Sequence, residues 1–528
     1  MNKYAALTYP LLSGLLLWAS WPVSPFTFLI FIAWVPFLWI EQDTKRGWRY
    51  FYQVYLMLLV WNAGTTWWVC NSTVPGGIAA IVANSFLMSL PWLAYFQVRK
   101  RLGQSWAYAA LVAFWLSFEY IHLNWQLSWP WLTLGNAFAS HPGWVQWYEY
   151  TGTTGGSLWV MLVNVLVVRA LRTATGPGKT GWKKWLRPAG ALLLPLLVSW
   201  GISASLFFPA SATSNVVVVQ PNIDPYQKFE AGMQDAQLQK MLRLSEEKLD
   251  PNTVLVVWPE TALNLPNGIE ENRLHEYPSF MPLWNFLKAH PRVKLLTGVE
   301  SYRLYTEASR TPTARATADA SQFFDSFNTA ALLDSTGAGS NYYHKSKLVP
   351  GVETLPTYLR FLDSWFEQFG GTGSGYTAQT ERSVLEDKTT GLRIAPAICY
   401  ESIYGEFMTA YIRNGANVIS IITNDGWWSN TSGHKQHKEY ARLRAIETRR
   451  WVLRSANTGI SCFIAPNGDL FEQQPWDTAA AAKSPLVLLH DLTFYVRFGD
   501  LISKIALTGA VAIILLALYQ RFRRKTSA

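Results

Sequence analysis

Cysteine and charge are both scarce in this chain. Its 528 residues contain only three cysteines, Cys70, Cys399 and Cys462, and 15% of the residues are charged. Three cysteines so far apart do not form the disulfide framework of a small secreted protein. The chain also contains no C-x-x-C pair and no histidine-rich stretch with metal-ligand spacing. We therefore expect no metal and no other cofactor.

Apolar and aromatic residues are abundant instead. Half of the residues are hydrophobic, and Trp, Tyr and Phe together make up 15% of the chain. A chain of this length exceeds one ordinary core, so at least two domains are expected. An aromatic-rich and charge-poor composition is typical of a protein with one part in a bilayer and another part in water.

The first 210 residues form a succession of apolar runs, and one more run lies near the end of the chain. Several of these runs approach the roughly 20 residues that cross a bilayer. A cleaved signal peptide does not explain the first run, because no small-x-small site follows it and further hydrophobic segments do. We expect spans at about 8–22, 25–40, 51–69, 77–97, 106–122, 156–171, 188–208 and 501–518.

Basic residues lie in every second loop between these runs, whereas the loops at 70–76 and 123–155 contain no Lys or Arg. This alternation follows the positive-inside rule for about eight spans with both termini in the cytoplasm. The segment between the seventh and eighth spans then faces outward, into the periplasm of a bacterium. The net charge of +10 consequently reflects topology signals, and no nucleic-acid partner is expected. The basic loop residues are Lys45, Arg46, Arg49, Arg99, Lys100, Arg101, Arg169, Arg172, Lys179, Lys183, Lys184, Arg187, Arg521, Arg523, Arg524 and Lys525.

The outward segment, about 214–490, has a different pattern. Short β-branched runs alternate with helical patterns at Asp235–Leu249 and Lys435–Ser455. Strands that alternate with helices indicate an α/β layered domain. The strands are expected at Val216–Val219, Val254–Val257, Leu295–Val299, Thr329–Leu333, Ile394–Ile398, Val418–Ile422 and Cys462–Ala465.

Two polar stretches, Tyr302–Phe324 and Phe369–Asp387, interrupt this pattern, and we expect both to be mobile loops. The second is rich in Gly, Thr and Ser and could serve as a lid. The expected domains are a transmembrane domain of seven spans at 1–213, the α/β domain at 214–490, and a last span with a basic cytoplasmic tail at 491–528.

Three expected strand ends of the α/β domain carry reactive groups. Glu260 follows an apolar strand, Lys345 lies in a stretch that continues to Glu353, and Cys399 and Glu401 end the strand at Ile394–Ile398. Each has an ordinary structural explanation when it is considered alone. A cysteine in an apolar run is usually core, a Pro-Glu-Thr carboxylate can begin a helix, and most lysines are solvated.

Taken together, these groups are chemically complementary. A cysteine that attacks a carbonyl group must lose its proton, and a nearby carboxylate such as Glu260 can accept it. The tetrahedral intermediate carries an oxyanion, which the Lys345 ammonium and a backbone N–H can stabilise. We therefore expect Glu260, Lys345 and Cys399 to meet at the ends of different strands.

These motifs resemble the nitrilase, or carbon–nitrogen hydrolase, superfamily. The chain matches its W-P-E, Y-x-K-x-x-L-V-P and I-C-Y-E motifs at residues 258–260, 343–350 and 398–401. With membrane spans around this domain, essentially the whole chain is similar to the bacterial apolipoprotein N-acyltransferase family. Further matching stretches, in the right order, are 219–222, 327–329, 423–428, His437, 441–447 and 454–460.

The resemblance implies a fold and a set of site residues. The fold is an α-helical membrane domain of about eight spans plus an α/β nitrilase-like αββα sandwich. Glu260 is implied as the base, Lys345 as the oxyanion-side lysine and Cys399 as the nucleophile. Supporting roles are implied for Glu353, Glu401, Tyr400 and Asn328, and substrate-binding roles for Phe229, Trp427, Trp428, Trp365 and Phe366.

The chain departs from the family pattern at two places. Gly351-Val352-Glu353 stand where the family often has Phe-Gly-Glu, although Glu353 keeps its distance from Lys345. The aromatic residue that usually follows Gln-Pro-Asn is best matched by Phe229, which leaves its role as a substrate gate open.

The implied reaction is a two-step acyl transfer in the bacterial inner membrane, with the catalytic domain in the periplasm. Cys399 takes an acyl chain from a membrane phospholipid as a thioester. The α-amino group of the diacylglyceryl-modified N-terminal cysteine of an apolipoprotein then receives the chain. A monomer is expected.

Two alternatives stay open at this point. The first is a membrane-anchored amidase of the nitrilase type, which would hydrolyse a small carbon–nitrogen substrate with the same three residues. The second is a transporter with a periplasmic accessory domain. Against the transporter, the expected spans lack buried charged pairs, with Glu119 the main exception and with His122 and Glu149 expected at the membrane interface.

Overall fold

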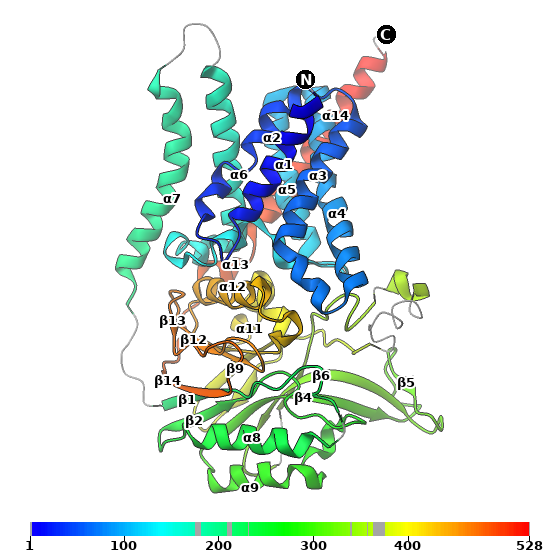
Figure 1. The fold of residues 1–528 in the computed structure, drawn as a ribbon, viewed down its shortest axis with the longest axis vertical. Helices are drawn as coiled ribbons and strands as arrows, with labels where there is room; N and C mark the ends of the chain where they lie inside the picture. The colour runs from blue at the N-terminus through cyan, green and yellow to red at the C-terminus, as the bar shows by residue number, and fades with distance from the viewer. Residues whose placement is uncertain are drawn as a thin grey trace. The chain divides into compact units, whose positions relative to one another are not determined.

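The computed structural model describes residues 3–174, 181–207, 214–230, 232–337, 341–355, 357–362 and 375–526. The chain divides into two compact units. Met1–Ser205 with Phe498–Ala528 form a helical unit, and Leu206–Arg497 form an α/β unit. In Figure 1 the helical unit is blue to cyan-green with the red α14, and the α/β unit runs from green to orange.

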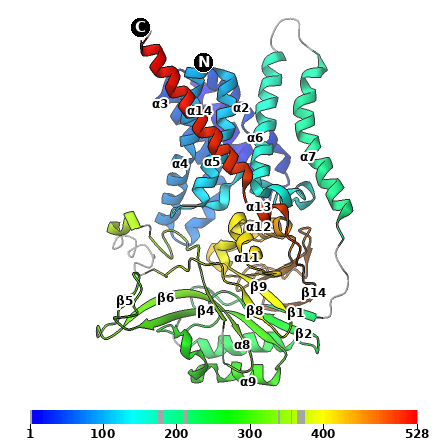
Figure 2. The ribbon, with the colours of Figure 1, turned by 180° about the vertical axis from the view of Figure 1, so that it is seen from behind.

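The helices of the helical unit follow the apolar runs of the sequence, and loop residues with special backbone preferences separate them. Gly103, at φ +84°, ends α4 and directly precedes α5, a conformation that glycine adopts without strain. Helix α14 packs against α4 and α5 through small and aliphatic residues such as Ala510 and Ile513 (Figure 2). The helices are α1 Lys3–Ala19, α2 Val35–Ile40, α3 Gly47–Thr66, α4 Val74–Leu102, α5 Gln104–Leu123, α6 Tyr148–Ala174, α7 Leu186–Ser205 and α14 Leu501–Thr526.

Four of the described helical segments are long and apolar enough to cross a bilayer: Val74–Leu102, Tyr148–Thr173, Trp182–Ser205 and Leu501–Arg523. The spans expected near 8–22, 51–69 and 106–122 are helical as α1, α3 and α5, but these helices do not reach the same length and hydropathy. Their crossing of a membrane stays a prediction.

The span expected at 25–40 is not one continuous helix. A short 3-10 helix at Thr27–Phe31 is followed by a break and then by the six-residue α2. Pro25 and Pro36 lie within this stretch, and Pro36 stands at the start of α2. Proline lacks the backbone N–H that a continuous helix would need at these positions.

The α/β unit contains two mixed sheets. Strands β1, β2 and β4 are parallel in the first sheet, and β9, β10 and β11 are parallel in the second. The first sheet has the order β14-β1-β2-β4-β6-β5, with β3 on β4 and β7 on β6, and the second has the order β13-β12-β11-β10-β9-β8. The strands are β1 Ser214–Gln220, β2 Thr253–Val257, β3 Ile269–Glu270, β4 Lys294–Tyr305, β5 Arg315–Ala316, β6 Phe323–Leu333, β7 Asn341–His344, β8 Leu385–Asp387, β9 Leu392–Ile398, β10 Val418–Thr423, β11 Val452–Ala456, β12 Cys462–Ile464, β13 Leu470–Phe471 and β14 Ala480–Leu486.

Helices cover the outer faces of both sheets. Helices α8 (Gln234–Glu246) and α9 (Met281–Ala289) lie on the first sheet, where their apolar side chains join those of β1, β2 and β4 in one core. Helices α11 (Gly405–Arg413) and α12 (Ser432–Thr448) cover the second sheet (Figures 1 and 2). The inner faces meet between β1 and β11, where the Ser455 hydroxyl donates to the Val219 carbonyl at 2.7 Å. The order of layers is therefore helix, sheet, sheet and helix.

Two of the expected local structures are wrong. The helix expected at Lys435–Ser455 ends at Thr448, because Arg449 takes a left-handed conformation and the chain continues as β11. The stretch Tyr302–Phe324 is partly strand, since β4 extends to Tyr305 and β6 begins at Phe323. Trp365, Phe366 and Phe369 lie outside the described residues. A short helix, α13 Phe494–Phe498, closes the α/β unit.

Candidate active site

Cys399 occupies a strained position at the end of β9. The strand is buried to its last residue, Ile398, and Cys399 begins a 3-10 helix that runs to Ile403. The φ of Cys399 is +51°, a left-handed conformation that residues with a side chain rarely adopt. Strain of this kind concentrates at functional sites, because the surrounding structure must impose it. The turn leaves the residue as a whole partly exposed at the end of a rigid strand.

Glu260 lies at the corresponding end of β2, in a second strained turn. Thr261 follows it with φ +49°. The chain of β4 passes so close that a Cβ atom added to Gly298 would lie 2.3 Å from the Thr261 nitrogen. The buried Lys228 ammonium binds the same turn, with Nζ 2.7 Å from the Glu260 carbonyl oxygen and 2.7 Å from the Thr261 hydroxyl. Two tight contacts thus fix the direction of the Glu260 side chain.

Lys345 joins two carboxylates. Its Nζ atom lies 3.2 Å from Oε1 of Glu260 and 2.8 Å from Oε1 of Glu353. Asn328, on β6, donates from the same amide nitrogen to both carboxylates, at 2.8 Å to Glu260 and 3.3 Å to Glu353. The backbone carbonyl oxygen of Asn328 accepts from the Lys345 backbone N–H at 2.8 Å. Glu260 after β2, Asn328 within β6, and Lys345 and Glu353 after β7 therefore form one hydrogen-bonded cluster.

Backbone donors hold the far oxygen of each carboxylate. The Asn424 N–H donates to Oε2 of Glu260 at 3.1 Å, and the Val349 N–H donates to Oε2 of Glu353 at 2.9 Å. The charged groups of this cluster are largely buried, since Glu260 is 7% exposed and Lys345 1% exposed. In such surroundings charge interactions are stronger than in water.

Burial and neighbouring charges set the protonation states. Burial alone lowers the pKa of Lys345, but Glu260 and Glu353 raise it well above its ordinary value, so the ammonium stays charged at neutral pH. Burial and the charge of Glu260 raise the pKa of the Cys399 thiol, and Lys345 only partly offsets them. The resting cysteine is therefore a thiol whose proton must leave when it reacts.

Glu401 is fully buried and connects the cysteine turn to the lysine loop. Its Oε2 accepts from the Ile398 N–H at 2.9 Å, and its Oε1 accepts from the Ser346 N–H at 2.6 Å and from the Tyr343 hydroxyl at 2.7 Å. This carboxylate holds the backbone of both segments. Tyr400 is buried and packs edge-on against Tyr404.

A second buried cluster lies behind Cys399. His437, on α12, places Nε2 3.2 Å from the Cys399 carbonyl oxygen and 3.0 Å from the Ser402 hydroxyl. Its Nδ1 lies 2.9 Å from Asp425, and the Arg454 guanidinium donates to the other Asp425 oxygen at 2.5 Å. Asp425, His437 and Arg454 are each 0% exposed.

The charges of this second cluster are balanced. Burial would raise the pKa of Asp425, but Arg454 and His437 hold it well below its ordinary range. Burial lowers the pKa of His437, so the imidazole is neutral at pH 7. Cys399, Asp425 and His437 also bring one possible metal-ligand atom each within 4.8 Å of one another. Arg454 already neutralises Asp425 there, and a second cation would have to compete with it.

The aromatic residues implied in substrate binding lie in different environments. Phe229 is 40% exposed, directly after the buried Lys228. Trp427 is partly exposed and packs edge-on against Tyr226, with ring centroids 5.2 Å apart. Trp428 packs against the His437 ring at 5.6 Å. Trp365 and Phe366 have no described position.

The helical unit contains a buried charged pair just beyond the ends of the spans expected at 25–40 and 77–97. Glu41 is fully buried and forms an ion pair with Arg99, while the Tyr95 hydroxyl donates to Glu41 at 2.8 Å. Arg99 also donates to the Glu41 and Thr44 carbonyl oxygens. Each member is thus satisfied by fixed neighbours, which is typical of a structural network.

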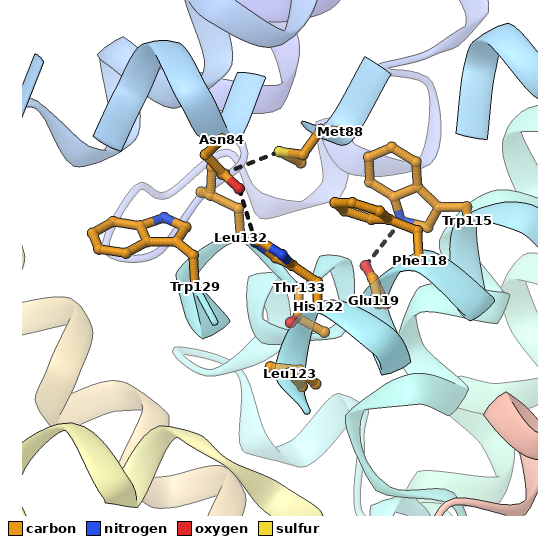
Figure 3. Close-up of a pocket in the computed structure, with 10 residues that line it drawn as sticks. All are labelled: Asn84, Met88, Trp115, Phe118, Glu119, His122, Leu123, Trp129, Leu132 and Thr133. Atoms are coloured by element: carbon orange, nitrogen blue, oxygen red, sulfur yellow. Dashed lines mark hydrogen bonds between the residues drawn. The ribbon is translucent and has the colours of Figure 1, made fainter. Parts of the chain in front are cut away.

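Figure 3 shows a small cavity in the helical unit beside Glu119 and His122. Its volume is about 10 Å³, which is room for about one water molecule. The Glu119 carboxylate accepts from the Trp115 indole at 2.9 Å and from the Leu134 N–H at 2.8 Å. His122 is buried against Asn84, and Glu149 is partly exposed; their expected position at the membrane interface stays a prediction.

The structure brings together the sequence-predicted Glu260, Lys345, Glu353 and Asn328, and the charges of Glu260 and Lys345 act on the Cys399 thiol. Sequence reasoning missed Lys228, and it also missed Glu300, whose carboxylate accepts from the Tyr376 hydroxyl at 3.3 Å. It assigned no role to Asp425, His437 and Arg454. A signal existed for Asp425, since Asn424-Asp425 directly follow the buried strand β10. No local signal distinguished Lys228 from a solvated lysine in a polar loop.

Comparisons with known proteins match both units. The family model of carbon-nitrogen hydrolases matches residues 215–492, and that of the apolipoprotein N-acyltransferase N-terminal domain matches residues 13–166. The apolipoprotein N-acyltransferase of Chlorobaculum tepidum is 29% identical over 527 residues, which cover 96% of this chain and 95% of that protein. That of Azotobacter vinelandii is 29% identical over 483 residues, which cover 86% of this chain and 82% of that protein. The solved structure of Saccharomyces cerevisiae Nit3, a nitrilase-superfamily member, covers 52% of this chain and 90% of its own at 16% identity and a TM-score of 0.35.

Proposed function

This chain belongs to the carbon–nitrogen hydrolase family, and we propose that it transfers an acyl chain from a membrane phospholipid to the N-terminal α-amino group of an apolipoprotein. The observation that carries the proposal is the Glu260–Lys345–Glu353 cluster, in which the charges of Glu260 and Lys345 act on the strained Cys399. The names of the relatives that match nearly the whole chain support the class of acyl acceptor. The apolar helices of the first unit are consistent with a membrane protein.

In the first step, the Cys399 sulfur attacks an ester carbonyl carbon of the phospholipid. Because the pKa of the thiol is raised, its proton passes to the Glu260 carboxylate as the C–S bond forms. The Lys345 ammonium offsets the negative charge on the carbonyl oxygen. The C–O bond then breaks, Glu260 returns the proton to the leaving alkoxide, and a lysophospholipid departs from the thioester.

In the second step, the α-amino group of the lipid-modified N-terminal cysteine of the acceptor attacks the thioester carbon. Glu260 accepts a proton from the amine, the C–S bond breaks, and the thiolate recovers that proton. An amine displaces a thiolate more readily than an alkoxide, so a thioester intermediate suits transfer to nitrogen. Glu353 keeps Lys345 in place through both steps, and the Lys345 charge lowers the cost of each oxyanion.

The same proposal places the chain in the inner membrane of a bacterium as a multi-pass protein. Both termini face the cytoplasm and the α/β unit faces the periplasm, as the distribution of basic residues favours. Both substrates would then meet the site from the outer leaflet. Alkylating reagents that do not cross the inner membrane should label Cys399 in whole cells, and protection of the thiol would contradict this orientation.

Trapping the acyl-enzyme tests the reaction directly. The purified full-length chain, mixed with phospholipid vesicles and no acceptor, should gain the mass of one acyl chain on Cys399. Addition of a diacylglyceryl-modified peptide should remove that mass and yield an N-acylated peptide. The Cys399→Ala variant should gain no mass while it remains folded in the membrane. Acylation of the variant, or rapid hydrolysis of the thioester with no N-acylated product, would reject the proposal, and the second result would favour an amidase.

A further inference from the structure

A groove runs along the β4–β6 ribbon of the α/β unit and has no role in the steps above. It encloses about 450 Å³ and includes residues of both strands and of the loop at Pro266–Gly268. Alternate residues of a strand point to the same face of a sheet, and directly paired residues on neighbouring antiparallel strands share that face. The register pairs Glu300 with Asn328, Tyr302 with Ser326, and Leu304 with Phe324. One face of the β4–β6 ribbon thus forms a continuous surface that runs from the apolar Leu304–Phe324 pair to the Glu300–Asn328 pair.

The inner end of this surface adjoins the general base. Asn328 donates to Glu260 at 2.8 Å, and Glu300 is its direct cross-strand neighbour. The Glu300 carboxylate therefore lies one side chain away from the reacting centre. A group bound at Glu300 would sit beside the reacting centre without being the atom that reacts.

Glu300 lacks the partners that the other site carboxylates have. Within the described ranges, only the Tyr376 hydroxyl donates to its carboxylate, at 3.3 Å, and no cationic side chain forms an ion pair with it within 4.0 Å. Lys228 acts on Glu300 from a greater distance, because its ammonium is bound to the Glu260 carbonyl and the Thr261 hydroxyl. By contrast, Glu260 and Glu353 are each bonded to Lys345. A partly buried carboxylate that faces a cavity and has no cationic partner is suited to bind a cationic group of a ligand.

We propose that this groove is a subsite for a primary ammonium group of a substrate, with the Glu300 carboxylate as the counter-charge. The subsite rests on the acyl transfer proposed above, and that reaction offers two sources of this group. One is the headgroup of an aminophospholipid donor, whose ester carbonyl lies several bonds from the nitrogen. The other is the α-ammonium group of the acceptor before it is deprotonated and moves to the thioester. A headgroup without an ammonium gains nothing from Glu300.

The test compares Glu300→Gln with the wild type in the two half-reactions of the full-length protein. The substitution keeps the shape and can still accept from Tyr376, but it removes the charge. Acyl-enzyme formation is followed by the mass of Cys399 with vesicles of phosphatidylethanolamine or phosphatidylglycerol that carry the same acyl chains. Transfer is followed from preformed acyl-enzyme to a diacylglyceryl-modified peptide. Glu307→Gln is the control, because Glu307 is exposed in the loop after β4 and pairs only with the exposed Arg310 among the described residues.

A rise of about tenfold in apparent KM confined to phosphatidylethanolamine would identify the donor headgroup as the source, and the same rise confined to the peptide would identify the acceptor. An equal change with both phospholipids, or no change in either half-reaction, would overturn the subsite while leaving the acyl transfer intact. If the wild type forms no acyl-enzyme, the proposed function fails first and the subsite with it.

A second measurement needs no variant. Ethanolamine should inhibit acyl-enzyme formation by the wild type at concentrations where ethylene glycol, which lacks the ammonium, does not. Equal inhibition by both compounds, or inhibition by neither, would count against an ammonium subsite. This readout remains decisive if the Glu300→Gln variant is not folded.

Discussion

Two buried clusters of charged side chains flank Cys399, and they differ in what they contact. The front cluster, Glu260 with Lys345 and Glu353, acts on the thiol. The rear cluster, Asp425 with His437 and Arg454, contacts the carbonyl oxygen of the same residue through His437. The front cluster supplies the groups proposed for the chemistry. The rear cluster holds the backbone that presents the thiol, although Asp425 and His437 also lie within 4.8 Å of the Cys399 sulfur.

The clusters also differ in charge balance. The front cluster holds two carboxylates on one ammonium and remains slightly open, with Glu353 at 12% side-chain exposure. The rear cluster is sealed and pairs one carboxylate with one guanidinium and a neutral imidazole. An excess of carboxylates over cations beside a thiol leaves one carboxylate able to accept a proton. A buried cluster whose charges balance is suited to holding the structure rigid. The two clusters should therefore fail in different ways when one charge is removed.

Loss of the front carboxylate should give the largest effect on rate. Glu260→Gln keeps the volume, and Lys345 retains Glu353 as a partner, so the chain should stay folded. Without the proton acceptor, acyl-enzyme formation should slow by about 10²–10⁴-fold. The rate is read from the mass of Cys399 over time, and thermal unfolding of the same sample serves as the control. A variant that acylates at the wild-type rate would remove Glu260 from the role of base.

Loss of the rear carboxylate should act mainly on stability. Asp425→Asn leaves the Arg454 guanidinium buried without a counter-charge, which costs about 3–5 kcal/mol in comparable sites. We expect a clear drop in the melting temperature of the full-length protein, and the protein that remains folded should still acylate Cys399. Glu386→Gln is the matched control, because Glu386 and Arg393 form an exposed pair worth less than about 1 kcal/mol. Unchanged melting with a strong loss of rate would assign Asp425 to the chemistry and erase the distinction between the clusters.

The front cluster is the part of the site that the sequence could predict. Its members follow continuous apolar runs such as Val254–Val257 and Ile394–Ile398, which became the buried strands β2 and β9. Parallel strands that are covered on both faces have nearly continuous apolar sequences, and reactive groups often lie at their ends. Local pattern made Cys399 and Glu260 candidates, and their chemical complementarity with Lys345 and the matching family motifs then selected them.

The rear cluster could not be predicted in the same way. Arg454 belongs to β11, which was expected to be part of a helix at Lys435–Ser455. Strand β11 forms because it pairs with β10, which is distant in the sequence. Lys228 is a further case. Its burial depends on the Glu260 turn, 32 residues away, and on the close approach of β4 at Gly298. Contacts of this kind leave no periodic signal, because they depend on how the elements pack.

The smallest expected effect is a dependence on pH that should appear in the front cluster alone. Burial lowers the pKa of Lys228 from 10.5 to about 8, with Glu260 and Glu300 opposing the shift. Acyl-enzyme formation should therefore fall above about pH 8, as Lys228 loses the proton with which it holds the Glu260 turn. In the rear cluster the pKa values of Asp425 and His437 are both lowered, so neither group should titrate in this range.

Stability separates this effect from unfolding. The folded chain releases the Lys228 proton near pH 8, whereas an unfolded lysine keeps it to about 10.5. Between these values the unfolded state binds more protons, so the contribution of this group to stability rises with pH while the rate falls. Lys228→Arg should keep its charge and move the decline in rate to higher pH, and Lys228→Gln should be slow with no decline above pH 8. If the rate of Lys228→Gln declines with pH as the wild-type rate does, the titration belongs to another group. The pH response of the front cluster would then come from residues other than Lys228, which holds the turn of Glu260.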